Sequence, residues 1–263
     1  MVDYIVYVIA LIYGIVIGSF LNVCIYRIPE EMSIVTERSH CTNCNSKLKW
    51  YELIPIFSYI FLLGRCRKCK ARISVQYPII EALNGVMYVL VFYFNGWDSI
   101  YTILLSVVYC FAISALIVLS VIDFRTNIIP VGINIFLLVM GLATVMSKYF
   151  QNRRGTDVVW DHAIGFFAIS LLLLLIFYAT RGRAIGGGDI KLMAAAGLLL
   201  GWELVILAFF IGCILAAIIH PIRMKISNIG RALAFGPYLS IGIVVALLFG
   251  RQLITWYIET FFL

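Results

Sequence analysis

The feature that most constrains the fold of this chain is a series of long apolar runs. A transmembrane helix needs about 20 apolar residues, and runs of suitable length lie at roughly 4–26, 79–95, 100–122, 128–147, 161–180, 203–221 and 233–250. A shorter run at 190–201 is separated from the next one by Gly201-Trp202-Glu203. One helix over 190–221 would be too long for a bilayer, so we expect a hairpin there and eight spans in total.

Composition supports a membrane protein. The chain has 263 residues, of which 63% are hydrophobic and 13% are charged, whereas soluble domains are roughly 45–50% apolar and about 25% charged. The sequence therefore predicts an all-α polytopic membrane protein. The net charge of +7 would suggest a nucleic-acid partner in a soluble protein. Here the basic residues cluster in loops, so membrane topology explains them and no nucleic acid is expected.

The polar segment 27–78 is the only sizeable region that the apolar runs leave outside the lipid. It holds nine of the twenty Lys and Arg residues, which by the positive-inside rule places it in the cytoplasm. The expected organisation is a first transmembrane helix at 1–26, a cytoplasmic four-cysteine loop domain at 27–78 and a multi-span domain at 79–263.

Two aspartates lie at membrane-boundary positions. Asp123 ends an apolar run in VIDFRTNIIP, and Asp189 opens another segment in IGGGDIK. With eight spans, both fall on the cytoplasmic face. A charge near the bilayer is costly, which makes it a functional hypothesis. Two carboxylates in contact share a proton, so that one activates water while the other, protonated, polarises a carbonyl. The pair therefore predicts an aspartyl hydrolase.

The three glycines before Asp189 fit the same chemistry. We expect Gly186, Gly187 and Gly188 to form a backbone turn closed to other residues and to let a substrate strand come near. Asp189 would then lie at a helix N-terminus, where the dipole favours the ionised form. Simpler interpretations remain open: Asp189 as an N-cap, and Asp123 paired with Arg125. A proton or ion transporter could use both carboxylates as a relay, and an assembly scaffold would need neither.

Four cysteines form two C-x-x-C pairs in the polar segment. They are Cys41, Cys44, Cys66 and Cys69. Two such pairs can give a closed tetrahedral zinc site with four thiolate ligands. Two disulfides are the alternative, but a cytoplasmic loop is reducing. The spacing therefore predicts a structural zinc ion that supplies much of the loop's folding energy.

Several sequence blocks resemble the type IV prepilin peptidases, a family of G-x-G-D aspartyl membrane proteases. IGGGDIKLMAAAGLLLGW and VIDFRTNIIP resemble the two aspartate regions of that family, and GSFLNVCIYRIP and LAFGPYLSIG resemble blocks near its ends. Val131 is a departure, because the family usually carries a polar residue there.

The resemblance implies residue roles and a substrate. Asp123 and Asp189 would be catalytic, and the supporting peptidase loop would comprise Gly186, Gly187, Gly188 and Lys191. The substrates would be prepilins or pseudopilins, whose short basic leader ends in glycine before a hydrophobic helix. The enzyme would be a multi-pass protein of the bacterial inner membrane with a cytoplasmic active site. A G-x-G-D protease of another specificity is the alternative, and the oligomeric state is left open.

In bifunctional members of the resembled family, the cysteine loop accompanies N-methylation of the new terminal residue by S-adenosylmethionine. LKWYELIPIFSYIFLLGRCRKC and ISVQYPIIEALNG resemble the flanking blocks, and Glu52 and Glu81 stand there as carboxylates that could deprotonate the incoming amine. Alternatively, Glu52 is a solvated charge and Glu81 caps a helix. The sequence has no G-x-G-x-x-G motif to locate a donor site.

Overall fold

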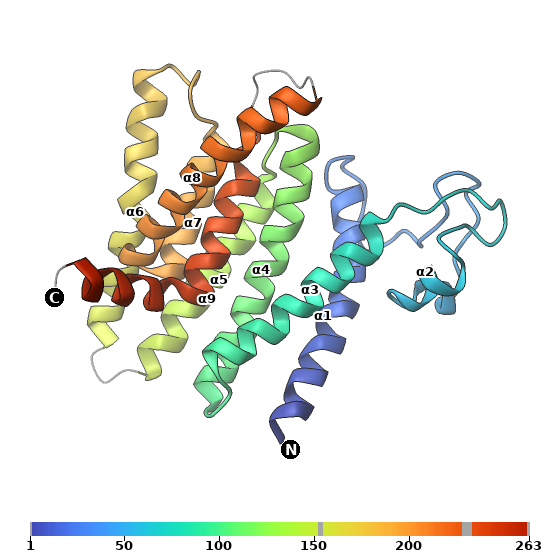
Figure 1. Cartoon of the computed structure of the whole chain (residues 1–263), viewed down its shortest axis with the longest axis horizontal. Coiled ribbons are helices and arrows are strands. Elements are labelled where there is room, and N and C mark those ends of the chain that lie inside the picture. Colours follow the sequence, from blue (N-terminus) through green and yellow to red (C-terminus); the bar gives the residue numbers. More distant parts are fainter. Residues whose placement is uncertain (1, 152–154, 228–232, 262–263) are drawn as a thin grey trace. The chain divides into compact units, whose positions relative to one another are not determined.

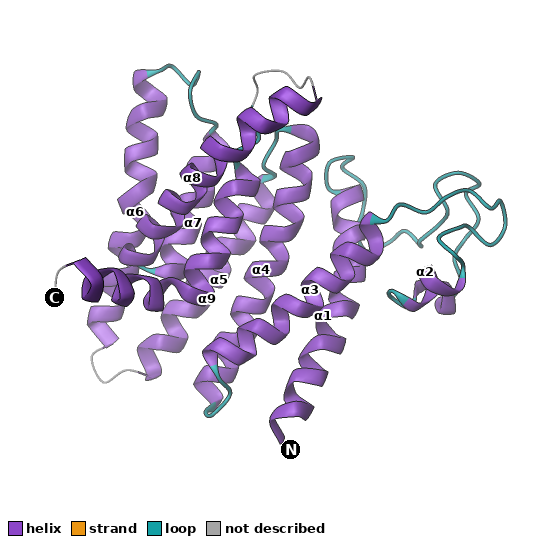
Figure 2. Cartoon of the chain, in the orientation of Figure 1, coloured by secondary structure: helices purple, strands orange, loops and turns teal. Residues whose placement is uncertain are grey.

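The computed structural model describes residues 2–151, 155–227 and 233–261 and is almost entirely helical (Figure 2). The chain divides into two compact units, Met1–Tyr93 and Phe94–Leu263. The elements in chain order are α1 (Val2–Arg27), η1 (Trp50–Leu53), α2 (Phe57–Phe61), α3 (Gln76–Asn95), α4 (Ile100–Thr126), α5 (Val131–Gln151), α6 (Gly155–Ala179), α7 (Gly187–Leu200), α8 (Trp202–Ser227) and α9 (Gly236–Phe261). The expected all-α architecture is confirmed.

In the first unit, α1 and α3 approach each other closely at glycines. A methyl group on Gly14 would lie 2.7 Å from Cα of Gly85, and one on Gly18 would lie 2.7 Å from Cα of Glu81. Asn84 donates a hydrogen bond to the Gly14 carbonyl at 2.7 Å. Small residues and buried amides are the usual means of joining helices in lipid, where water provides no driving force. The same crossing buries Glu81.

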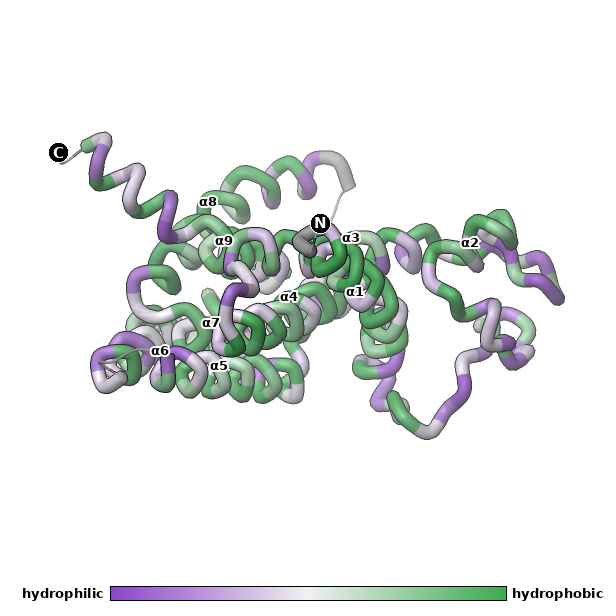
Figure 3. Tube along the Cα trace, turned by 90° about the horizontal axis from the view of Figure 1, so that it is seen from below, coloured by the Kyte–Doolittle hydropathy of each residue, from purple (hydrophilic) through white to green (hydrophobic). Residues whose placement is uncertain are grey.

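The segment between α1 and α3 is mostly irregular, and it combines hydrophilic stretches with a hydrophobic one around α2 (Figure 3). Its regular elements are the short helices η1 and α2 and two isolated antiparallel bridges, His40 with Lys47 and Arg65 with Arg72. Among its described residues only Gly64 and Cys66 are buried. Because so few of its residues are buried, this segment gains little stability from a core of its own, and the sequence predicts that a metal ion stabilises it.

The second unit is a bundle of α4 to α9 in which α7 is central. Leu192, Met193 and Leu199 of α7 are at most 1% exposed. A methyl group on Gly197 would collide with the backbone of Gly165 on α6, so these two helices also pack at a glycine contact.

Seven of the described helices are long and apolar enough to cross a membrane, and α7, which covers nearly all of the expected 190–201 run, is not among them. Its 14 residues extend only about 21 Å, which is less than the roughly 30 Å of a hydrocarbon core. The expected break between the two runs is confirmed at Gly201, which has φ 92°. The expected eighth full span is corrected to a short helix. Surrounding protein buries α7, so this helix need not match the thickness of the lipid.

The helices of the second unit alternate in direction, which defines two ends of the bundle. The carboxylate end holds the C-termini of α4, α6 and α8 and the N-termini of α5, α7 and α9 (Figure 1). Contacts join these termini: Gly236 with Asp123, Asn134 with Gly188, and Arg223 with the ring of Phe124. We call the opposite end of this bundle the far end.

Candidate active site and cysteine cluster

Asp123 lies near the C-terminus of α4 and is fixed by the start of α9. It is 3% exposed, and its Oδ2 accepts a hydrogen bond of 2.9 Å from the backbone N–H of Gly236. A methyl group on Gly236 would lie 2.7 Å from that oxygen. Glycine therefore permits the close approach, and the N–H favours the ionised carboxylate.

Asp189 lies in the first turn of α7 and is 8% exposed. The two predicted carboxylates lie near enough for the charge of Asp123 to act on Asp189. Asp189 is outside the seven candidate spans. Burial and, second, the Asp123 charge raise the pKa of Asp189 to about 6. The predicted place at a helix N-terminus is confirmed, and there burial and the like charge act against the helix dipole, which favours the ionised form.

The glycine triplet does not form the expected special turn. Gly186 is the N-cap of α7 with φ −75°, and the next two glycines are its first helical residues. None of the three has a positive φ. Two of them are instead short of space: a methyl group on Gly188 would lie 2.8 Å from Cβ of Ile129, and one on Gly186 would lie 3.2 Å from Oδ2 of Asp189. Gly187 faces open space.

Asn134 is a site residue that the sequence analysis missed. It lies on α5, is 5% exposed, and its Nδ2 donates a hydrogen bond of 3.4 Å to the carbonyl of Gly188. Among the described residues its Oδ1 has no hydrogen-bond partner. The available signal was a lone polar residue in an apolar run. Lys191, one turn into α7, is exposed, and its role stays a prediction.

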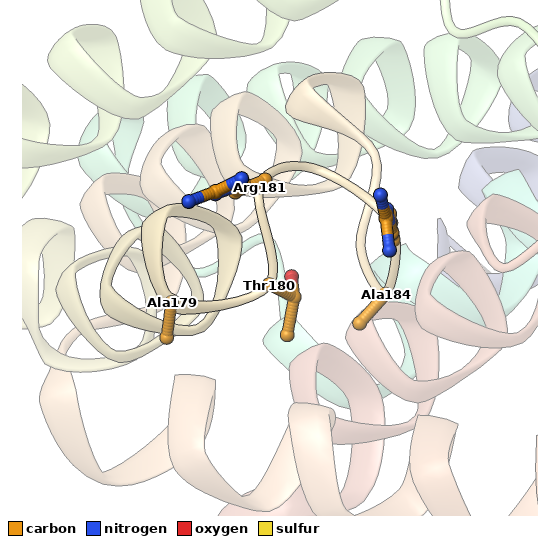
Figure 4. Close-up of a pocket in the computed structure, with 5 residues that line it drawn as sticks. Ala179, Thr180, Arg181 and Ala184 are labelled. Carbon is orange, nitrogen blue, oxygen red and sulfur yellow. The ribbon is translucent and has the colours of Figure 1, made fainter.

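A cavity of about 490 Å³ lies in the loop that leads from α6 to the glycine triplet (Figure 4). Its lining residues are Ala179, Thr180, Arg181, Arg183 and Ala184. The loop is therefore positively charged just before Asp189. No carboxylate lines this cavity.

The four cysteines converge as predicted. Their Sγ atoms all lie within 4.8 Å of one another, and those of Cys41 and Cys69 are 3.9 Å apart. Tetrahedral zinc with bonds of about 2.3 Å places its sulfur ligands roughly 3.8 Å apart. All seven cysteines of the chain are free, so the disulfide alternative is not the arrangement found. The cluster could hold a metal ion.

The two C-x-x-C pairs form equivalent knuckles. In the first, Asn45 has φ 52° and donates its N–H to the Cys41 carbonyl; in the second, Lys70 has φ 59° and donates to the Cys66 carbonyl. Each knuckle turns the chain so that both sulfurs face one point. Hydrogen bonds from the backbone of Cys69 and Lys68 lower the pKa of Cys66.

The side chain of Ser46 also stabilises a thiolate. Its hydrogen bond lowers the pKa of Cys44 to about 6. Thiolates are the form that binds zinc, so the donor set fits the predicted metal.

The two candidate methyltransferase carboxylates have different surroundings. Glu52 is partly exposed and accepts the N–H of Lys49 at 2.7 Å, so it caps η1 locally. Glu81 is 5% exposed and accepts the N–H of Ile56 at 2.7 Å. Ile56 has φ 59°, which is an outlier for a β-branched residue and marks strain of the kind found at functional sites. Glu81 therefore anchors a strained linker between η1 and α2.

Comparison with known proteins gives consistent matches along the chain. Residues 12–94 match the bacterial Peptidase A24 N-terminal domain, and residues 110–220 match the type IV leader peptidase family. Curated proteins named prepilin leader peptidase/N-methyltransferase are similar over most of their length. The one from Aeromonas salmonicida (strain A449) is 31% identical, over 95% of this chain and 92% of that protein. The one from Pectobacterium carotovorum subsp. carotovorum is 33% identical, over 87% of this chain and 88% of that protein. No solved structure matches the chain significantly.

Proposed function

The chain belongs to the type IV leader peptidase family, and on that basis we propose that it is a membrane aspartic endopeptidase that removes the leader from prepilins or pseudopilins. The observation that carries the proposal is the buried carboxylate pair, Asp123 and Asp189, at one end of the helical bundle. A membrane site suits a substrate whose cleavage point adjoins a hydrophobic helix.

The surroundings of the two carboxylates suggest how they divide the reaction. Asp123, which accepts the Gly236 N–H, is the ionised group and takes a proton from the attacking water. Asp189, whose pKa is raised to about 6, holds the shared proton and donates a hydrogen bond to the scissile carbonyl. The proton that Asp123 receives then passes to the leaving amine, which returns the pair to its starting charge. Asn134 positions the Gly188 peptide beside Asp189.

The peptidase proposal is tested with the purified full chain in detergent micelles and a prepilin that carries its leader. Mass spectrometry of the products should show a single cut directly after the leader glycine. An ion or proton transporter would instead give flux in proteoliposomes and leave the prepilin intact. Intact prepilin under conditions in which the chain is folded would reject the proposal.

A second reaction, N-methylation of the new terminus, is part of the proposed function. Its support is the naming of the relatives as N-methyltransferases and the buried Glu81. S-adenosylmethionine would supply the methyl group when bound. Transfer needs a neutral amine, and a carboxylate such as Glu81 can take the ammonium proton. Glu52 remains a weaker candidate because it caps η1. A one-methyl mass increment on the cleaved pilin should appear only when the donor is added.

Zinc is the metal proposed for the cysteine cluster. Support comes from the sulfur spacing and from the paired knuckles that supply four thiolates. A closed four-sulfur shell leaves no open position, so the ion would be structural. Metal analysis of the purified protein should find about one zinc per chain, as four thiolates to one ion require. A metal-free chain with intact disulfides would overturn both the ion and the reducing compartment.

The proposed location is the bacterial inner membrane, with the carboxylate pair facing the cytoplasm. The basic residues of segment 27–78 support this orientation. The predicted domain limits, 1–26, 27–78 and 79–263, stay predictions. Cysteine labelling of Arg183→Cys from either side of sealed vesicles tests the orientation, because Arg183 is exposed in the loop before Asp189.

A further inference from the structure

A second polar cavity lies at the far end of the bundle, opposite the two aspartates. Its volume is about 370 Å³, which is within the roughly 300–1,000 Å³ of small-molecule sites. Residues of α5, α6, α7, α8 and α9 all line it. The last part of α9 turns across this end of the bundle and supplies one wall (Figure 1).

Two cations and two anions line this far-end cavity, and no direct ion pair joins them to one another. The cations are Lys148 and Arg251, and the anions are Asp161 and Glu203. All four lie in the described part of the chain, and no ion pair within 4.0 Å joins any two of them. They come from four different helices, so the bundle holds them apart around the space. A ligand with both charges would satisfy them together.

A buried histidine fixes the position of Lys148. His162 is 1% exposed, and its Nδ1 is 2.7 Å from the carbonyl of Leu198. A carbonyl only accepts, so Nδ1 carries the hydrogen. The ammonium of Lys148, which only donates, is 3.3 Å from Nε2. The ring is therefore neutral and orients the lysine, and Oδ2 of Asp161 lies 3.8 Å from the same Nε2.

Exposed aromatic residues place the far-end cavity at headgroup depth. Four of the five polar side chains that line the cavity have an exposed aromatic residue as an immediate neighbour in sequence: Tyr149 follows Lys148, Trp160 precedes Asp161, Trp202 precedes Glu203, and Trp256 follows Thr255. Tyr and Trp concentrate where a membrane meets water. Leu200, Leu204 and Ile254 give the cavity an apolar side, which suits the glycerol and acyl part of a lipid.

We propose that the far-end cavity binds an ammonium–phosphate zwitterion, and that its source is the headgroup of phosphatidylethanolamine. The ammonium of Lys148 attracts the phosphate as a compact positive charge, and the planar guanidinium of Arg251 donates hydrogen bonds to its oxygens. Asp161 and Glu203 accept hydrogen bonds from the primary ammonium. Choline lacks N–H donors, and glycerol lacks the positive charge, so both headgroups fit less well. The inference does not depend on the proposed peptidase activity.

The test is native mass spectrometry of the delipidated full chain, titrated with phosphatidylethanolamine, phosphatidylcholine and phosphatidylglycerol of identical acyl chains. We expect phosphatidylethanolamine to bind at least tenfold more tightly than the others. Lys148→Met and Arg251→Gln should each weaken the binding of phosphatidylethanolamine at least tenfold. Lys225→Met, a matched change on an exposed lysine at the other end of the bundle, should bind like the wild type.

Competition with glycerophosphoethanolamine distinguishes the two sources of the zwitterion. Weak competition supports the lipid, whereas displacement at equal concentration supports the same site with a soluble ligand. If Lys148→Met does not fold, Glu203→Gln serves in its place. It should lower the affinity for phosphatidylethanolamine and leave that for phosphatidylglycerol unchanged. Equal affinities for all three lipids, or variants that bind like the wild type, would overturn the proposal.

Discussion

Substituting the glycine triplet one position at a time tests why glycine precedes Asp189. In Gly188→Ala the added methyl group would lie 2.8 Å from Cβ of Ile129. Carbon atoms in ordinary contact are roughly 3.5–4.0 Å apart. The start of α7 must therefore shift by roughly 0.7 Å or more, and Asp189, the next residue, shifts with it.

A displacement of that size is large for catalysis. Misplacing a catalytic group by about 1 Å can cost about 10²-fold in rate, so we expect kcat/KM of Gly188→Ala to fall by roughly 10–100-fold. Gly187→Ala is the matched control, because nothing lies within 4 Å of its added methyl group. It should stay within about twofold of the wild type and gain roughly 0.5–1 kcal/mol of helix stability.

The assay measures prepilin cleavage by the three purified proteins, with melting temperature as the check that each is folded. A fully active Gly188→Ala would refute the packing argument. Gly187→Ala as impaired as Gly188→Ala would also refute it, and would indicate that the glycines serve substrate approach, as the sequence analysis expected.

Three further predictions concern other parts of the chain. The pKa of Asp189 is raised to about 6, so Asp189 loses its proton as pH rises through 6. We therefore expect kcat to fall over this range. A kcat that increases instead would contradict the assignment of the proton to Asp189. Removing zinc with a chelator, or substituting Cys69→Ser, should expose segment 27–78 to limited proteolysis; unchanged cleavage patterns would mean that the metal does not stabilise the loop. Glu81→Gln should reduce methyl transfer about 10²-fold if the carboxylate takes the amine proton, with Glu52→Gln close to the wild type as its comparison; equal effects of the two changes would remove the special role of Glu81.

The sequence predicted the helices well because the bilayer imposes a length and a composition that are visible in one dimension. The cysteine cluster was equally predictable, since a C-x-x-C pair is a local turn and four thiolates leave little choice of partner. The centre of the bundle was harder. α7 is as apolar as a transmembrane helix. It can be shorter than the bilayer because α5, α6 and α8 bury it, and no local sequence pattern indicates that burial.

The glycine triplet shows a different limit. A glycine can be required for its φ or for its small volume, and the sequence alone does not distinguish these needs. At Gly188 the need is space beside Ile129, which comes from another helix. Gly236 and Asn134 were not singled out for the same reason: each contacts the site across a large separation in sequence, from α9 and α5.

The central claim is that Asp123 and Asp189 act as one catalytic pair, and conversion of each to asparagine tests it most directly. Asparagine keeps the size of the side chain but can neither ionise nor carry the shared proton. Prepilin co-expressed with Asp123→Asn or Asp189→Asn should keep its leader, with processing at least about 10²-fold slower than in the wild type. Near-normal leader removal by either variant, measured by the mass of the pilin, would contradict the account.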